Sequence, residues 1–317
     1  MVTPVFLTAD IEFAWRHHAA GHDLDGVYQR SIEPAGVGLA FQLETLRRHE
    51  MKACFFVDPM PALLFGLDPI RRIVDAVLEA EQEVQLHLHP NWAGARVDDA
   101  GAHYGRFQLH EYDLAEQSAL IAGATDLLTA AGAPPPIAFR AGNYGADDHT
   151  LRALAANGFS YDSSHNGAQA SRTSRLSLPP RRISPVAGTV IEVPVTVIED
   201  SPGSLRTFQL CALSSNEASH ALDHAAAAGH AAVTIVSHGF ELANRAGTRA
   251  NMVHVRRFEA LCSLLDDRRD DLPTVHFKDR PSLRLDADDA PLGPDMLRTR
   301  WRQAEQLWSN WVAERVA

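Results

Sequence analysis

The 317-residue sequence predicts an α/β fold whose parallel sheet closes, or nearly closes, into a β/α barrel. Short, continuous apolar runs rich in β-branched and aromatic residues alternate with helical patterns, as is typical of buried parallel strands joined by helical crossovers. Roughly seven or eight such units follow one another, which favours a barrel over a doubly wound open sheet. No GxGxxG follows the first apolar run, which disfavours a dinucleotide-binding sheet and a nicotinamide-dependent enzyme.

The apolar runs place the strands of this sheet in order along the chain. The predicted strands are 5–9, 53–57, 84–88, 137–141, 159–163, 190–195, 231–237 and 274–277. Helical patterns lie between them, at 36–50, 70–82, 113–133, 146–158, 214–229 and 253–267. Asp113 is placed to cap the helix that ends near Gly132. Segment 165–189 is rich in Ser, Arg and Pro and predicts a long surface loop.

The chain is expected to divide into a barrel over residues 1–282 and a C-terminal helical extension over 283–317. Four-three spacing in the extension predicts one apolar stripe, formed by Leu297, Trp301, Ala304, Trp308 and Trp311. We expect this helix to pack on the barrel. A contact between two copies of the chain is the alternative, and it would make a homo-oligomer through this helix.

Charge and composition argue against nucleic acids and membranes as partners. The formal net charge of -11 disfavours a nucleic-acid surface and an anionic lipid surface, and no apolar run is long enough to span a bilayer. We therefore expect no nucleic acid and no membrane as partner. The three widely spaced cysteines, Cys54, Cys211 and Cys262, give no disulfide framework and are expected to be buried thiols. The start of the sequence lacks the pattern of a signal peptide, so a cytoplasmic location is expected.

Polar residues gather where the predicted strands end, which is where β/α barrels hold catalytic groups. The set comprises Asp10 and Glu12 in TADIE, His87, His89 and Asn91 in HLHPN, Arg140 and Tyr144 in FRAGNY, Asp162 in YDSSH, His238 and Glu241 in SHGFE, and His276. Residues two apart on an extended segment share a face, so His87 and His89 could bind one ion. Two histidines and a carboxylate suit a catalytic zinc, and a second carboxylate could serve as base. His17, His18 and His22 lie in a polar stretch and are expected to be exposed to solvent, with contact to the substrate as the alternative.

Each of these residues alone also suits a structural role, and the prediction depends on their occurring together and in this order. That ordered set resembles the polysaccharide deacetylase family of metal-dependent carbohydrate esterases. TADIE resembles the family's first acidic motif, and RRHEMKACFFVDP resembles its second strand. FRAGNYG resembles the Arg-x-Pro-x-Tyr motif, with Gly142 where proline is usual. YDSS and SHGFE resemble the fourth and the last motifs.

The histidine motif departs from the family's His-Ser/Thr-x-x-His pattern. His87 matches the first position, but Asn91 occupies the second. His89 is therefore the expected substitute ligand, in a His-x-His-Pro form, and whether His89 or Asn91 reaches the metal stays open.

The resemblance implies a distorted, incomplete (β/α) barrel, usually of seven strands. It implies that Asp10 is the base and that Glu12, His87 and His89 bind a divalent metal, for which zinc is the first choice. His238 would be the general acid, and Arg140 would orient Asp10 and hold it ionised. Asn91 and Tyr144 are expected beside the substrate. The aromatic rings of Trp92, Tyr104 and Phe107, which follow the histidines, could stack on a sugar.

The expected activity is metal-dependent removal of an N-acetyl or other acyl group from a sugar or glycan precursor. A small-molecule amidohydrolase acting on cyclic amides or ureides is the first alternative. A noncatalytic sugar-binding protein that kept the fold is the second.

Overall fold

A computed structural model describes residues 2–96, 106–170, 172–186 and 188–314. Its main sheet has eight strands in the order β10-β1-β2-β3-β4-β5-β7-β6, and a separate hairpin pairs β8 with β9. The strands are β1 (Val5–Ile11), β2 (Cys54–Val57), β3 (Glu83–Leu88), β4 (Ala138–Ala141), β5 (Tyr161–Asp162), β6 (Ser184–Pro185), β7 (Ile191–Glu192), β8 (Val197–Ser201), β9 (Ser204–Thr207) and β10 (Val233–His238).

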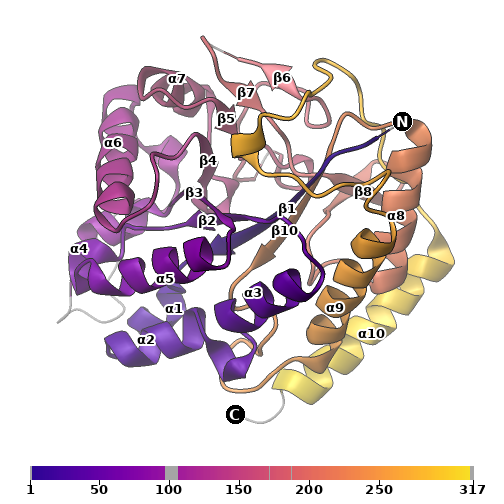
Figure 1. Cartoon of the computed structure of the whole chain (residues 1–317), viewed down its shortest axis with the longest axis horizontal. Coiled ribbons are helices and arrows are strands. Elements are labelled where there is room, and N and C mark those ends of the chain that lie inside the picture. The colour runs from indigo at the N-terminus through magenta and orange to yellow at the C-terminus, as the bar shows by residue number, and fades with distance from the viewer. Residues whose placement is uncertain (1, 97–105, 171, 187, 315–317) are drawn as a thin grey trace.

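The main sheet curls into a distorted, incompletely closed (β/α) barrel (Figure 1). All its strand pairs are parallel except β6 with β7. Apart from the antiparallel β6, the sheet therefore has seven parallel strands, as expected. The free edge of β10 is partly covered, because Gln209 forms a parallel bridge with Val236 and the Thr196 amide donates to the Thr234 carbonyl at 3.1 Å. The predicted fold class is confirmed.

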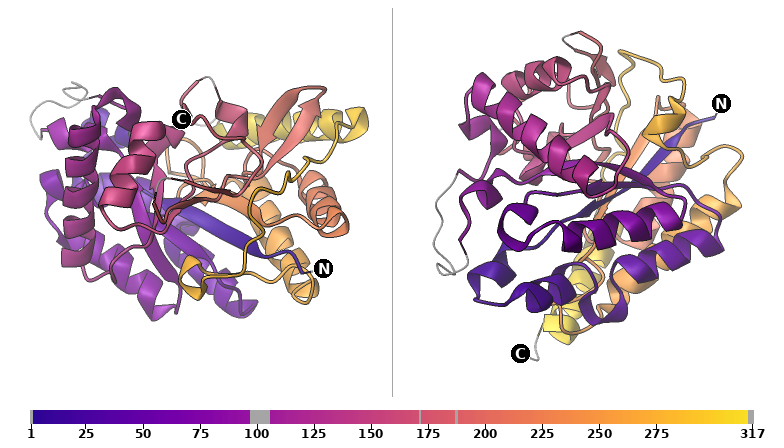
Figure 2. Two further views of the ribbon diagram at one scale, coloured as in Figure 1. Left: turned by 90° about the horizontal axis from the view of Figure 1, so that it is seen from above. Right: turned by 60° about the vertical axis from the view of Figure 1, so that its left-hand side comes forward.

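Helices cover the outside of the curled sheet (Figures 1 and 2). They are α1 (Trp15–Ala19), α2 (Leu24–Ser31), α3 (Leu39–Arg48), α4 (Ala62–Phe65), α5 (Asp68–Glu79), α6 (Leu114–Ala130), α7 (Asp148–Ala156), α8 (Ser215–Ala228), α9 (Met252–Asp267) and α10 (Met296–Glu314). Asp113 caps α6 by accepting from the Glu116 amide at 2.9 Å, as predicted. Ser214 caps α8 in the same way, and Gly229 ends it with a left-handed φ of 64°.

The core lies between the strands and the inner faces of the helices. Every residue of β1 is buried, and α5 buries Ile70, Ile73, Val74 and Val77 at helical spacing. Each such aliphatic side chain contributes about 1.5–3 kcal/mol when removed from water. The strands are therefore held rigidly, and the residues at their carboxyl ends are fixed in place.

The structure corrects three predictions, which concern the strand at 274–277, the place of His276 and the loop at 165–189. Segment 274–277 is not a strand: Thr274 forms one bridge with Val5, and a 3₁₀ turn begins at Phe277. His276 is buried near Gln82, at the amino end of β3, and is thus at the wrong end of the sheet for the expected site. The loop at 165–189 is only partly at the surface, since His165 and Asn166 are buried, and it contains β6.

Helix α10 lies along the outside of the molecule beside α9 (Figure 1). Its apolar stripe is exposed and does not face the barrel. Leu297 is 81% exposed and Trp301 is 66% exposed. The helix is attached by polar contacts instead: Arg302 with Glu217 and Asp200, Glu305 with Arg257, and Ser309 with Asn251. The helix does pack on the barrel, as expected, but through this polar face and not through the predicted apolar stripe. The division into 1–282 and 283–317 stays a prediction.

Two further expectations concern single residue types. His17 and His18 are buried in α1, contrary to the prediction of solvent exposure, and the His18 ring lies against Trp92 and Phe65. Cys54 and Cys262 are buried and Cys211 is partly buried, and all three are free thiols.

Within the described part of the chain, no helix has the length and apolar character needed to cross a membrane.

Candidate metal centre and active site

Two strand pairings assemble the candidate site at the carboxyl edge of the sheet. Asp10 on β1 is in register with His238 on β10, and His87 on β3 is in register with Arg140 on β4. Because parallel strands end at the same edge, residues far apart in the sequence meet here. Glu12 follows β1 directly, and His89 follows β3.

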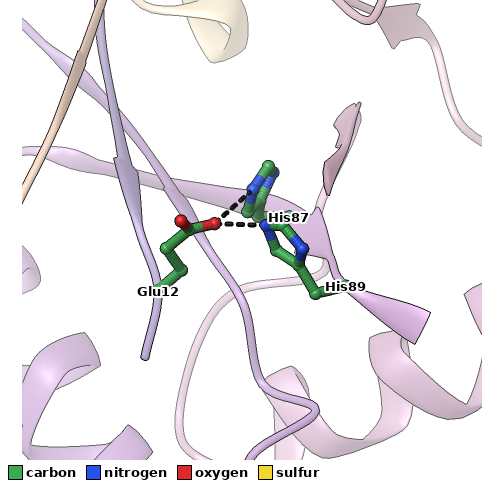
Figure 3. Close-up of side chains that lie close together, drawn as sticks. All are labelled: Glu12, His87 and His89. Carbon is green, nitrogen blue, oxygen red and sulfur yellow. Dashed lines mark hydrogen bonds and ion pairs between the residues drawn. The ribbon is translucent and has the colours of Figure 1, made fainter. Parts of the chain in front are cut away.

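Glu12, His87 and His89 converge on one point (Figure 3). Their candidate ligand atoms all lie within 4.8 Å of one another. The Nε2 atom of His87 lies 3.2 Å from Glu12 Oε2, and Nε2 of His89 contacts the same oxygen. Among the described residues this is the one group of three or more His, Cys, Asp and Glu side chains with spacing suitable for a metal ion.

The surroundings of this trio fit a divalent metal. The Nδ1–H of His87 donates to the Arg140 carbonyl at 2.8 Å, which leaves Nε2 as the lone-pair nitrogen that faces Glu12. Burial alone would raise the pKa of Glu12, but the charges and hydrogen bonds of His89 and His87 hold that pKa well below its usual value. Burial lowers the pKa of His89, and Glu12 outweighs it and raises that pKa to about 9. A carboxylate and two imidazoles that face one point are a donor set that would suit an open zinc site.

Arg140 holds Asp10 from inside the barrel. Its Nη1 donates to Asp10 Oδ1 at 2.7 Å and to the Thr8 hydroxyl at 2.9 Å. Its Nε and Nη2 donate to the carbonyl and hydroxyl of Ser163, and its guanidinium lies 4.3 Å from the centre of the Phe56 ring. Arg140 is fully buried and does not line the cavity, so it acts on the site by fixing the position of Asp10.

His238 faces Asp10 from β10 and is itself held by a carboxylate. Its Nδ1–H donates to Glu241 Oε1 at 2.8 Å, and its Nε2 lies 3.8 Å from Asp10 Oδ2. Gln209 Nε2 donates to the same Glu241 oxygen. Burial lowers the pKa of His238, but Glu241, Asp10 and Glu12 together raise it to about 9. His238 is therefore protonated at neutral pH and can give up a proton beside Asp10.

A polar cavity of about 410 Å³ opens over these groups. Its lining comprises Asp10, Glu12, His87, His89, Gln108, Ala141, Asn143, Tyr144, Gln169, Thr173 and His238. Asn143 and Tyr144 have left-handed backbones, with φ of 53° and 58°, a strain that proteins tend to store at functional sites. Gln108 Oε1 and Thr173 Oγ1 are buried without a hydrogen-bond partner among the described residues, so both are available to a ligand.

Most of the predicted site residues meet at this cavity, but Asn91 and Trp92 do not line it. Trp92 is 1% exposed and packs against Trp15, with ring centres 4.9 Å apart, so the expected stacking on a sugar is wrong for this ring. Asn91 is buried in the 3₁₀ turn Pro90–Gly94, while His89 contacts Glu12. The predicted Tyr104 contact falls outside the described residues.

Several residues of the site had no assigned role in the sequence. Glu241 stands three residues after His238, a spacing that could have pointed to the pair. Gln108, Gln169 and Thr173 come from loops without a repeating pattern, and no sequence signal identified them. Asp58 follows β2, and burial raises its pKa to about 6 close to the two histidines.

No protein-family model matches this sequence, and no curated protein matches it. Among solved structures, the chain is similar to a putative polysaccharide deacetylase from Mycobacterium smegmatis, with 17% identity, a TM-score of 0.49, and 88% of this chain and 94% of that chain covered. It is also similar to a family 4 carbohydrate esterase from Streptomyces lividans solved with acetate, with 13% identity, a TM-score of 0.44, and coverage of 92% and 98%.

A third similar structure is a CE4 family pseudoenzyme from Bacillus anthracis, with 12% identity and a TM-score of 0.40. That similarity covers 94% of this chain and 66% of that chain. The first two structures, a polysaccharide deacetylase and a carbohydrate esterase, are of the kind that the sequence motifs resemble. Identities and TM-scores are low throughout, so the function is inferred below from the side chains of this chain.

Proposed function

We propose that this protein is a metal-dependent hydrolase that removes an N-acetyl or other acyl group from a sugar or glycan precursor. The observation that carries the proposal is the meeting of three groups at one cavity: the Glu12–His87–His89 trio, the carboxylate of Asp10, and the imidazole of His238. A structural histidine cluster would need neither an open cavity nor a buried carboxylate beside a protonated imidazole.

Glu12, His87 and His89 would hold the metal, with zinc as the proposed ion. When bound, such an ion polarises an acyl carbonyl and makes water a better nucleophile. Asp10 accepts the proton of the attacking water, because Arg140, which also donates to the Thr8 hydroxyl, fixes the Asp10 carboxylate at the cavity wall. His238 donates a proton to the leaving nitrogen as the C–N bond breaks and the new C–O bond forms.

The lining of the cavity supports a substrate rich in hydroxyl or amide groups. Gln108, Asn143, Gln169 and Thr173 offer neutral donors and acceptors, and Tyr144 adds a hydroxyl. Such groups pair with the hydroxyls of a sugar ring and with the amide of an N-acetyl group. An acylated sugar therefore suits this lining, and a cavity of about 410 Å³ suits a small sugar unit.

A small-molecule amidohydrolase acting on cyclic amides or ureides is the second candidate. It is favoured by one observation: Trp92, the expected stacking ring, is in the core, and Tyr144 is the one Phe, Tyr or Trp among the described cavity residues. Flat amide rings need hydrogen-bond partners more than a stacking surface. A noncatalytic sugar-binding role is the remaining alternative.

The proposed cytoplasmic location is supported by the free cysteines. Cys54, Cys211 and Cys262 form no disulfide, and burial raises the pKa of each thiol. Buried thiols of this kind suit a reducing compartment.

Elemental analysis of the purified protein tests the metal site. We expect about one zinc or similar ion per chain in the wild type and its loss in His87→Ala. His220→Ala is the matched control, because His220 is exposed on α8, and it should keep the ion. Wild-type protein that stays free of metal after incubation with zinc or cobalt would rule out the site.

Substitution of the base separates catalysis from binding. Asp10→Asn keeps the size of the side chain and should keep the metal, but hydrolysis should fall by about 10²–10⁴-fold. The probes are an N-acetylglucosamine tetramer, for the sugar substrate, and hydantoin, for the cyclic amides. Hydrolysis of hydantoin alone would select the amidohydrolase. Metal binding without hydrolysis of either probe would favour the noncatalytic alternative, and an Asp10→Asn protein with the wild-type rate would end the assignment of the base.

A further inference from the structure

Gly142 follows β4 directly and lies against the ring of His89. A Cβ atom on Gly142 would lie 2.5 Å from His89 Nδ1, 2.6 Å from Cε1 and 2.7 Å from Cγ. Real Cβ atoms do not approach other heavy atoms so closely. The ring of His89 therefore occupies the space that any side chain at position 142 would need.

The backbone at Gly142 does not itself require glycine. The positive-φ residues of the described chain include Asn143 and Tyr144 but not Gly142. An alanine could adopt the same backbone conformation, so the chain makes use of the missing side chain rather than of unusual torsion angles. Glycine is used here because it lets another group, the His89 ring, approach the backbone closely.

The His89 ring has little freedom to move away. Its Nε2 contacts Glu12, its side chain is 13% exposed, and Pro90 follows it as the first residue of a 3₁₀ turn. Its ring centre lies 4.9 Å from that of His87. Displacing the ring from Gly142 would therefore move Nε2 away from Glu12 and His87.

We propose that Gly142 is a positioning residue for the metal centre, and that His89 can serve as the third ligand only because position 142 has no side chain. The inference depends on the metal site of the proposed function. It also joins two departures in the sequence: His89 as the substitute ligand, and Gly142 where the resembling motif usually has proline. In the structure these two departures depend on each other, because the His89 ring fills the space that a side chain at position 142 would need.

Metal affinity tests this inference without any substrate. Zinc competition against a chelator would be measured for the wild type, Gly142→Ala and a control in the same loop, Gly145→Ala. The three atoms nearest to a Cβ at Gly145 would all belong to Gln108, namely Oε1 at 2.1 Å and Cβ and Cδ at 3.1 Å, and none to a candidate metal ligand. We expect Gly142→Ala to weaken zinc binding by about 10–100-fold, as loss of support around a ligand does, and Gly145→Ala to leave it unchanged. The cobalt-loaded protein should show an altered visible spectrum for Gly142→Ala alone.

A double variant separates a clash with His89 from general damage to the loop. Thermal unfolding of the metal-free proteins should show that Gly142→Ala lowers the Tm of the wild type and leaves the Tm of His89→Ala unchanged, because the ring that it meets is absent there. Equal losses of Tm in both backgrounds would overturn the inference, and so would wild-type zinc affinity in Gly142→Ala. Wild-type protein that binds no zinc would instead count against the proposed function, while the Tm comparison would still decide the contact.

Discussion

At the scale of single residues, Arg140 links the two halves of the site. Its carbonyl accepts from His87 at 2.8 Å, and its guanidinium donates to Asp10 at 2.7 Å. One residue thereby sets the free nitrogen of a candidate ligand and the position of the candidate base. Such shared support keeps ligand and base in a fixed relation, which is what preorganised catalysis needs.

The pair of Glu241 with His238 leads to a prediction about pH. The pKa of His238 is raised to about 9, so its protonated, proton-donating form is present below that pH and is lost as the pH rises through it. Glu241→Gln removes the negative charge and should move the alkaline fall in kcat to lower pH by about 1–3 units.

The pH profile of kcat, measured with whichever of the two probes named above is hydrolysed, checks this shift. Glu44→Gln on the surface of α3 is the control and should keep the wild-type profile. An unchanged alkaline limb in Glu241→Gln would show that Glu241 does not set the acidity of His238.

At the scale of elements, the pairing of β5 with β7 contains an unusual contact. Asp162 and Glu192 are in register on these neighbouring strands and both are fully buried. Burial raises the pKa of both carboxyl groups, and the charge of Asp162 raises that of Glu192 further. The pair is therefore stable in the fold when it carries a proton.

This contact predicts how stability depends on pH. Because the pKa values are raised in the folded state, the stabilisation is present below the unfolded pKa values and is lost as the pH rises through the folded ones. Glu192→Gln replaces the protonated acid by an amide of the same shape. Its Tm should fall less than that of the wild type between neutral and alkaline pH.

Thermal unfolding followed by circular dichroism over that pH range measures the difference. Glu199→Gln on β8, at a partly exposed position, should follow the wild type. A Glu192→Gln protein whose Tm falls as steeply as that of the wild type would contradict the shared proton.

At the scale of the whole molecule, α10 is joined to the barrel by charge and hydrogen bonds, not by its apolar stripe. Arg302 lies between Glu217, at 3.1 Å, and Asp200, at 2.5 Å, and Glu217 is 2% exposed. Arg302→Ala would leave that buried carboxylate without its cation. We expect a loss of about 1–3 kcal/mol in the free energy of unfolding, measured with urea. Arg300→Ala, at an exposed position of the same helix, should change it by less than about 0.5 kcal/mol.

Because the apolar stripe of α10 is exposed, the predicted contact between two copies of the chain stays a prediction. Its four-three spacing is that of a seam between paired helices, and an exposed apolar face of this kind usually meets a partner. We expect the wild type to form a dimer and the double variant Trp301→Glu, Trp308→Glu to be a monomer, measured by light scattering after gel filtration. Gln303→Glu, also exposed on α10, should stay dimeric. A monomeric wild type would exclude this contact.

Local patterns in the sequence predicted most of the strands and helices of the fold. Continuous apolar runs marked β1 to β4 and β10, and capping residues such as Asp113 marked helix ends, because both depend on neighbours within a few residues. The apolar run at 274–277 failed as a strand because a sheet pairing also needs an available edge, and there only Thr274 meets Val5. The β8–β9 hairpin was missed because it is short and largely polar.

The sequence by itself determined which chemical groups stand at the ends of the strands, since spacing along a strand sets which residues share a face. It could not determine what lies opposite them. That His89 contacts Glu12 while Asn91 is buried, that Trp92 is in the core, and that the ring of His89 needs the space at Gly142 were decided by the tertiary structure. The reason is physical: these contacts join residues on different strands and loops, and a periodic pattern reports only the spacing within one segment.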